Sequence, residues 1–348
     1  MVSSIINEIK YRKNYLNGEI IETIYFGGGT PSILEIEEIE NILRTIYKHH
    51  TIAAGAEISF EANPDDLKPE YLRNLKSLGI NRLSIGIQSF IEKDMELLRR
   101  SHTTEQSLRS VSDSIIEKFN NINIDLIYGI PGQDIMQWRE NIDTALGLGI
   151  QHISAYHLTF EPGTVFDHWR KKGRLAAVDE EQSLTQLEIL IEKTKNKGFE
   201  HYEISNFALP GFISMHNSNY WRQVKYTGIG PSAHSYNGIS RRWNIANNLK
   251  YIRAIQNKGD NYYDHEELTP TDLFNEYILT SLRTVWGIDM TAIDSKFGVD
   301  YVKYTNEKAD RFLMGGELEK NGMIIRLTDK GILVSDYIIS EFFMIKKI

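Results

Sequence analysis

The sequence predicts an α/β fold, in which an incomplete parallel (β/α) barrel is followed by a smaller helical module. Short apolar strands alternate with segments of helical period from the start of the chain to about residue 205, which is the pattern of a parallel sheet covered by helices. Gly79, Gly149 and Gly198 each stand between a helical segment and the next strand, as C-terminal cap glycines do. Six strands are fewer than the eight of a complete barrel, and the chain opens on a helix, so one leading strand is expected to be missing.

The elements follow in order from hydrophobic periodicity. The expected strands are 22–26, 56–60, 82–87, 122–128, 152–159 and 201–204, and helices are expected over 33–47, 69–78 and 183–197. Pro69 suits the first turn of its helix, where its missing N–H costs nothing. The carboxyl ends of parallel strands meet at one edge of the sheet, so polar residues at those ends are candidates for a shared site.

The alternation stops near residue 205, and three segments are expected: a partial barrel over 1–205, a loop-rich linker region over 206–265, and a helical, winged-helix-like module over 266–348. The last segment reads as helix, helix, short strand pair and helix. A winged helix can bind DNA, but the expected recognition helix here carries Glu307 and Asp310, which favours a packing role.

Composition excludes several function classes. The 348 residues carry a net charge of −8 and a pI near 5.7, which argues against nucleic-acid and anionic-membrane binding. No apolar run approaches the ~20 residues of a membrane span, and the first residues do not resemble a secretory signal, so a cytoplasmic location is expected. The chain has no cysteine, which excludes disulfides, thiolate metal sites and cysteine nucleophiles.

A glycine triplet, Gly27 to Gly29, follows the first strand and precedes Thr30 and Pro31. Such a triplet either makes a tight turn or brings backbone N–H groups against a ligand. It is no phosphate loop, because neither a following Gly-Lys-Ser/Thr nor a GxGxxG spacing is present.

Polar residues recur where further strands end: Glu61 and Gln88 follow two expected strands, and Asp125 lies within the segment NIDLIYG of a third. One of them alone could be a buried hydrogen-bonding group, but three together with a glycine loop favour a ligand site. A glycine loop, two carboxylates and an amide suit a zwitterion that carries a ribose, because a carboxylate can accept from paired hydroxyls.

These motifs resemble a known family. GGGTP after a strand, a Glu on the next strand, IGIQSF and NIDLIYGIPGQ are similar to the S-adenosylmethionine (SAM) site of the oxygen-independent coproporphyrinogen oxidase and heme chaperone branch of radical SAM proteins, and the similarity extends through YHLTFEPGT to the tail. The resemblance implies that Gly28, Gly29 and Thr30 bind the methionyl amino group. It implies that Glu61, Gln88, Arg100 and Asp125 hold the methionyl and ribose groups, with Asp125 on the ribose hydroxyls. For Arg100, an exposed helix cation beside Arg99 is an equal alternative.

The chain departs from this family in one respect. The family has a CxxxCxxC loop after its first strand that binds a [4Fe–4S] cluster, and no such loop is present here. Together with the missing strand, this predicts that the chain is a fragment of a longer protein, and a natural relative that lost the cluster is the alternative. In either case the chain itself should not cleave SAM.

A second motif is HNSNYW, His216 to Trp221, followed by GIGPSAHS over 228–235. A neutral imidazole can ligate heme iron, and flanking aromatic rings suit a flat macrocycle, although a packed structural loop is the common alternative. The motif resembles the heme-binding signature of the heme chaperone branch, which implies His216 as iron ligand with Tyr220 and Trp221 beside it. His234 is a second candidate ligand.

The predicted function is that of a radical SAM-type heme chaperone, which binds heme and passes it to client proteins. The alternative is an oxygen-independent coproporphyrinogen III oxidase, which decarboxylates two propionate groups in porphyrin biosynthesis. A third possibility, an interaction module without cofactor, rests on the missing cysteines alone. The expected ligands are SAM and heme, with client proteins as partners and no nucleic acid.

Overall fold

The computed structural model describes residues 1–173, 175–257 and 261–345. The chain forms two compact units. Unit 1 comprises Met1–Ile24, Leu34–Ala56 and Met215–Ile348, and unit 2 comprises Tyr25–Ile33 and Glu57–Ser214. The predicted three-segment division at residues 205 and 265 stays a prediction.

A seven-stranded sheet confirms the predicted α/β class. Its strands are β1 (Ile21–Phe26), β2 (Ile52–Ala62), β3 (Arg82–Gln88), β4 (Ile122–Tyr128), β5 (His152–His157), β6 (Glu200–Glu203) and β7 (Asn206–Ala208), in the order β1-β2-β3-β4-β5-β7-β6. The strands β2 to β5 pair in parallel. The sixth predicted strand does not continue this parallel series. It is an edge strand, because the unforeseen β7 is inserted antiparallel between β5 and β6.

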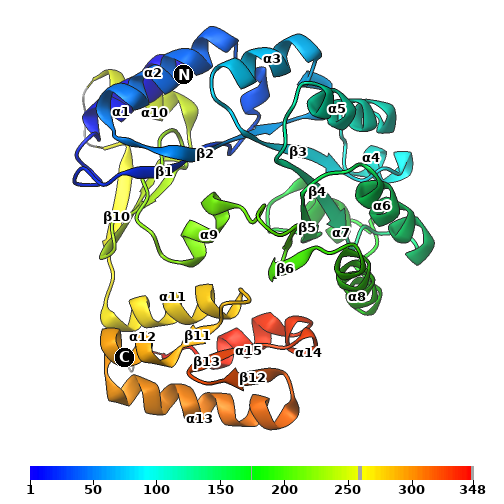
Figure 1. Ribbon diagram of the computed structural model, residues 1–348, viewed down its shortest axis with the longest axis vertical. Helices are drawn as coiled ribbons and strands as arrows, with labels where there is room; N and C mark the ends of the chain where they lie inside the picture. Colours follow the sequence, from blue (N-terminus) through cyan, green and yellow to red (C-terminus); the bar gives the residue numbers. More distant parts are fainter. Residues whose placement is uncertain (174, 258–260, 346–348) are drawn as a thin grey trace. The chain divides into compact units, whose positions relative to one another are not determined.

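Helices cover the outer side of the sheet in unit 2. They are α3 (Pro69–Ser77), α4 (Glu92–Leu97), α5 (Thr104–Ile116), α6 (Ile135–Gly147), α7 (Val165–Lys171) and α8 (Glu180–Asn196), with short 3₁₀ turns η1 (Pro31–Ile33) and η2 (Pro64–Asp66). Figure 1 shows α5, α6 and α8 beside β3, β4 and β5. The buried Trp138 of α6 donates its indole N–H to the carbonyl of Gln186 at 2.8 Å, which joins α6 to α8.

The central strands have two chemically different faces. Ile85, Ile124 and Ile153 are fully buried at successive positions across β3, β4 and β5. Ser84 and Asn123, which are paired neighbours one residue away, are buried polar side chains. Because alternate residues of a strand face opposite sides, the outer face is an apolar core beneath the helices and the inner face is polar.

Unit 1 contains more regular structure than the sequence predicts. Its first part has α1 (Val2–Tyr11), α2 (Ile36–His49), α9 (Met215–Trp221) and α10 (Asn248–Gln256), with the antiparallel sheet β10-β9-β8 of Tyr263–Glu267, Ser240–Asn244 and His234–Tyr236. The region expected to be loop-rich, 206–265, thus contains α9, β8 and β9, which the sequence did not predict. The strands were missed because they are short and their sequences, such as SRRWN and YDHEE, lack the alternation of apolar residues that marks a half-buried strand.

The C-terminal module has the helix, helix and strand-pair order that the sequence predicts. It comprises α11 (Pro270–Leu282), β11 (Ile288–Asp289), α12 (Met290–Phe297), α13 (Val299–Gly315), β12 (Leu318–Asn321), β13 (Ile324–Leu327), α14 (Asp329–Ile332) and α15 (Ser335–Glu341). The final helix, which the sequence predicts as one element after the strand pair, is divided, with α14 ending at Ile332 and α15 beginning at Ser335. Among the described residues, no helix is long and apolar enough to cross a membrane.

Candidate functional site

The glycine loop after β1 packs tightly on one side and is open on the other. A Cβ on Gly27 would collide with the Tyr25 ring and lie 2.7 Å from Glu61 Oε1, so only glycine fits there. Gly28 has a φ of +78° and, like Gly29, has nothing within 4 Å of the position a Cβ would take. The loop can therefore accept a ligand at Gly28 and Gly29, which is where the resemblance places the methionyl amino group.

Glu61 fixes this loop. Its Oε1 accepts a 2.5 Å hydrogen bond from the Tyr25 hydroxyl, and its Oε2 accepts the Gly28 N–H at 3.1 Å. Burial, followed by the proximity of Glu61, raises the pKa of Tyr25 far above its ordinary value, so the phenol stays a donor. Two of the four acceptor positions of the carboxylate are thus used within the protein, and two remain for a ligand.

Asp125 lies on the polar inner face at the level of Ser154. Its Oδ1 accepts the Asn123 amide at 2.8 Å, and Ser84 Oγ lies 3.4 Å from its Oδ2. Although the residue keeps some exposed surface, its carboxylate is deep enough that desolvation raises the pKa of Asp125 to about 6. The charge of Glu61 acts in the same direction, and the Asn123 hydrogen bond opposes it.

Arg100 and Gln88 both lie beside Gly86 near the end of β3. The Arg100 guanidinium donates to Asn63 Oδ1 at 3.0 Å and to the Gly86 carbonyl at 3.2 Å. The alternative of an exposed helix cation is wrong for Arg100, because it lies beyond the end of α4 and is partly buried, whereas Arg99 is exposed. Gln88 has a φ of +73°, and its Nε2 lies 3.0 Å from the position a Cβ on Gly86 would take.

Unit 2 thus contains all the residues proposed for SAM, and the open loop and remaining acceptor positions fit a ligand with an ammonium and hydroxyl groups. The iron–sulfur cluster does not fit. The chain has no thiolate to ligate iron, and no group of three or more His, Asp or Glu side chains able to hold a metal ion occurs among the described residues.

The second motif forms α9, within unit 1. His216 Nδ1 lies 3.1 Å from Thr23 Oγ1, a residue of β1 in the same unit. The Tyr220 ring meets the His216 ring edge-on with centroids 4.9 Å apart, and Tyr226 meets Tyr220 in the same way at 4.7 Å. Trp221 lies under the guanidinium of Arg283 at 5.2 Å. The imidazole therefore belongs to a row of aromatic rings, of which Tyr220 is 40% exposed.

His234 and the glycines before it have a structural explanation. The His234 ring stacks on Trp243 in the β8–β9 ladder with centroids 6.2 Å apart. A Cβ on Gly228 would collide with the His234 carbonyl oxygen, so this close approach requires glycine. Neither contact involves His216.

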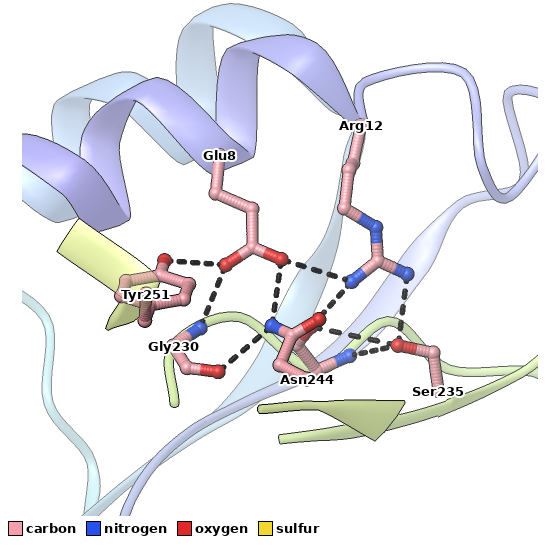
Figure 2. A network of polar contacts seen from close by, with 7 residues as sticks. Glu8, Arg12, Gly230, Ser235, Asn244 and Tyr251 are labelled. Carbon is pink, nitrogen blue, oxygen red and sulfur yellow. Dashed lines mark hydrogen bonds and ion pairs between the residues drawn. The ribbon is translucent and has the colours of Figure 1, made fainter. Parts of the chain in front are cut away.

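A buried ion pair that the sequence reasoning missed holds the segment 228–235 (Figure 2). The Glu8 side chain is fully buried, and Arg12 donates to it at 3.3 Å. The other contacts of Glu8 are with the Gly230 N–H and the Asn244 amide at 2.8 Å and with the Tyr251 hydroxyl at 2.5 Å. Arg12 donates in turn to the Gly228 carbonyl at 2.6 Å and to Ser235 Oγ at 2.8 Å.

This network explains GIGPSAHS as a structural segment. Its Gly230 N–H and Gly228 carbonyl are partners of a buried carboxylate and guanidinium, which would be costly to bury unpaired. A signal for Glu8 was present in the sequence, since it lies one turn after Ser4 and beside Ile5 and Ile9 on the apolar side of α1, four residues before Arg12.

The sequence matches two family models and is similar to several characterised proteins. The model of the radical SAM superfamily matches residues 2–145, and that of the HemN C-terminal domain matches residues 268–334. The heme chaperone HemW of Mycobacterium tuberculosis is 31% identical over 95% of this chain and 83% of its own length. The heme chaperone HemW of Bacillus subtilis is 37% identical over 80% of this chain and 74% of its own length.

Among solved structures, coproporphyrinogen III oxidase (HemN) from Escherichia coli, a radical SAM enzyme, superposes with a TM-score of 0.83 at 23% identity, over 98% of this chain and 82% of its own. That likeness shows a shared fold. The identity to the chaperones, over most of both chains, shows the closer kinship. The chain belongs to the HemW heme chaperone family of the radical SAM superfamily.

Proposed function

We propose that this protein binds heme with His216 as an axial ligand of the iron and passes the heme to client proteins. The proposal rests on the surroundings of the His216 imidazole on α9. A hydrogen bond from one imidazole nitrogen to a neighbouring group orients a ligating histidine and selects the other nitrogen for the metal. Thr23 Oγ1 lies at Nδ1, and by accepting a hydrogen bond there it would leave Nε2 as the nitrogen that ligates the iron.

The aromatic row supports the same proposal. Tyr220 and Trp221 flank His216 in sequence, and a porphyrin is a large flat apolar ring that packs against aromatic side chains. The names of the relatives agree with it, since they are heme chaperones. A cytoplasmic location, the client proteins and the lack of nucleic-acid binding stay predictions.

For SAM we propose the contacts of unit 2: Gly28, Gly29 and Thr30 for the methionyl amino group, with Glu61, Gln88, Arg100 and Asp125 for the methionyl and ribose groups. Membership of the superfamily implies SAM together with an iron–sulfur cluster. No reaction step through a cluster follows from the residues of this chain, which contribute binding contacts only.

The test compares three porphyrins: hemin, iron-free protoporphyrin IX and iron-free coproporphyrin III. Hemin and protoporphyrin IX share the same ring and side chains, so a preference for hemin measures the iron–histidine bond. We expect hemin to bind at least tenfold more tightly than either iron-free ring. Tightest binding of coproporphyrin III, with its additional carboxylates, would contradict the proposal and favour the oxidase function.

A further inference from the structure

Behind Asp125, a line of buried polar side chains crosses the inner face of the sheet in unit 2. Asn123 donates from Nδ2 to Asp125 Oδ1 at 2.8 Å and to Ser84 Oγ at 2.7 Å. On its other side, Asn123 Oδ1 lies 2.6 Å from His152 Nδ1, and His152 Nε2 lies 2.8 Å from the Tyr202 hydroxyl. Asn123, His152 and Tyr202 are each 3% exposed or less.

The chemistry of these groups fixes the direction of every hydrogen bond. If the Asn123 amide were turned over, its carbonyl oxygen would face the Asp125 carboxylate, and two acceptors would meet. The amide nitrogen therefore faces Asp125, and the carbonyl oxygen must be met by a donor on the side of β5. His152 Nδ1 must then carry a proton.

His152 is neutral in this setting. Burial lowers the pKa of His152 well below its ordinary value, and the charge of Arg82 acts in the same direction. With its proton on Nδ1, a neutral imidazole has an unprotonated Nε2, which accepts from the Tyr202 hydroxyl. The proton donors thus run from Tyr202 through His152 and Asn123 to the Asp125 carboxylate.

Ser154 cannot replace His152 in this line. Its hydroxyl lies 2.8 Å from Asn206 Oδ1 and 3.1 Å from Asn123 Oδ1 and also interacts with the Asp125 carboxylate, and it has one proton for all these acceptors. The amide nitrogen of Asn206 is engaged by Glu203 Oε2 at 2.6 Å, so its oxygen faces Ser154. The Ser154 hydroxyl therefore donates to Asn206, to which its contact is shorter. The Asn123 carbonyl oxygen then depends on the His152 N–H for its hydrogen bond.

We propose that Asn123, oriented by His152 and Tyr202, is the positioning residue that fixes the Asp125 carboxylate for the ribose hydroxyls of SAM. This inference rests on the proposed role of Asp125. A carboxylate that is free to rotate loses orientation entropy on binding paired hydroxyls, whereas one tethered through Oδ1 presents its remaining acceptors in a fixed direction. Nothing in the sequence motif alone separates Asn123 from its neighbours in NIDLIYG.

Isothermal titration calorimetry with SAM from pH 5 to 8 tests the proposal. In Asn123→Ala we expect the affinity to fall by about tenfold and the pH midpoint of binding to rise, because a hydrogen bond to the charged form of Asp125 is lost. The charged and titratable groups that act on Asp125 or on its neighbours, and that stay unchanged in this variant, are Tyr25, Glu61, Arg82, Arg100, Tyr156 and Glu203.

A matched pair of variants separates positioning from packing. His152→Asn keeps a donor near the place of Nδ1 and should retain the wild-type affinity and midpoint, whereas His152→Leu should behave like Asn123→Ala. Asn141→Ala is the control for damage to the fold, because Asn141 is an equally buried asparagine that holds Ser89 and the Phe90 N–H in unit 2. It should lower the melting temperature and leave the pH midpoint of SAM binding unchanged.

The wild-type protein offers a test that needs no variant. Nitrogen-15 NMR of the imidazole should show His152 as the neutral tautomer with its proton on Nδ1 at pH 7, and a charged ring or a proton on Nε2 would overturn the inference. Unchanged SAM affinity and midpoint in Asn123→Ala, with weakened binding in Asp125→Asn, would refute the positioning role and leave the SAM site standing. Unchanged binding in both would refute the site itself.

Discussion

Replacing Asp125 by asparagine should change stability and SAM binding in opposite directions. Desolvation raises the pKa of Asp125 from 3.8 to about 6, so the folded protein favours the protonated acid. The resulting stabilisation is complete below pH 3.8 and is lost as the pH rises to about 6. A shift of two pKa units corresponds to a difference of about 3 kcal/mol in the free energy of unfolding. Asp125→Asn keeps the shape and an acceptor for Asn123 and removes this cost of ionisation.

We therefore expect Asp125→Asn to unfold at higher urea concentration than the wild type, by up to about 3 kcal/mol at pH 8 and about half of that at pH 5. The same variant should lose ~1–3 kcal/mol of SAM affinity, because it loses a charged acceptor for the ribose hydroxyls. Urea unfolding at both pH values and calorimetry measure the two effects. A variant less stable than the wild type at pH 8, or one that binds SAM equally well, would refute the reasoning.

Three further outcomes follow from the structure. Anaerobic reconstitution with iron and sulfide should give no [4Fe–4S] electron paramagnetic resonance signal, since no thiolate is present, and a stoichiometric signal would contradict this. Glu8→Gln should destabilise the protein by about 3 kcal/mol in urea unfolding, because it leaves the Arg12 charge buried and unpaired, whereas Glu19→Gln, at an exposed ion pair, should change stability by less than about 0.5 kcal/mol. Thr23→Val should lower the fraction of histidine-ligated heme in the absorption spectrum and Thr23→Ser should restore it; equal spectra for both would exclude an orienting role for Thr23.

The barrel strands could be predicted because each contains a run of apolar residues, and three of them also follow a helix that ends at a glycine, Gly79, Gly149 or Gly198. Ile85 and Ile124 sit in such runs and are fully buried, as the pattern predicts. The strands β8 to β10 could not be predicted from apolar periodicity. Their residues are held by ladder hydrogen bonds and ring stacking, as in the pair His234 and Trp243, rather than by an apolar face.

Glu61 and Gln88 were found near strand ends, where periodicity makes them visible, and Asp125 was found within a strand, but the side chains that support them were not found. Asn123 and His152 stand at strand positions that look like ordinary polar residues, and their role comes from pairing across β4 and β5. Glu8 and Gly230 lie 222 residues apart in the chain and meet only after folding. Contacts of this kind depend on tertiary register, which a single sequence does not display.

The most direct test of the heme proposal is a hemin titration of the wild type and His216→Ala, followed through the Soret band. The wild type should give the shifted, sharpened band of a histidine-ligated heme with one equivalent bound. His216→Ala should lose that band while its circular dichroism is unchanged, and His234→Ala should retain it. If hemin binds to wild type and His216→Ala alike, with the spectrum of free hemin, His216 does not ligate the iron and the proposed heme site is wrong.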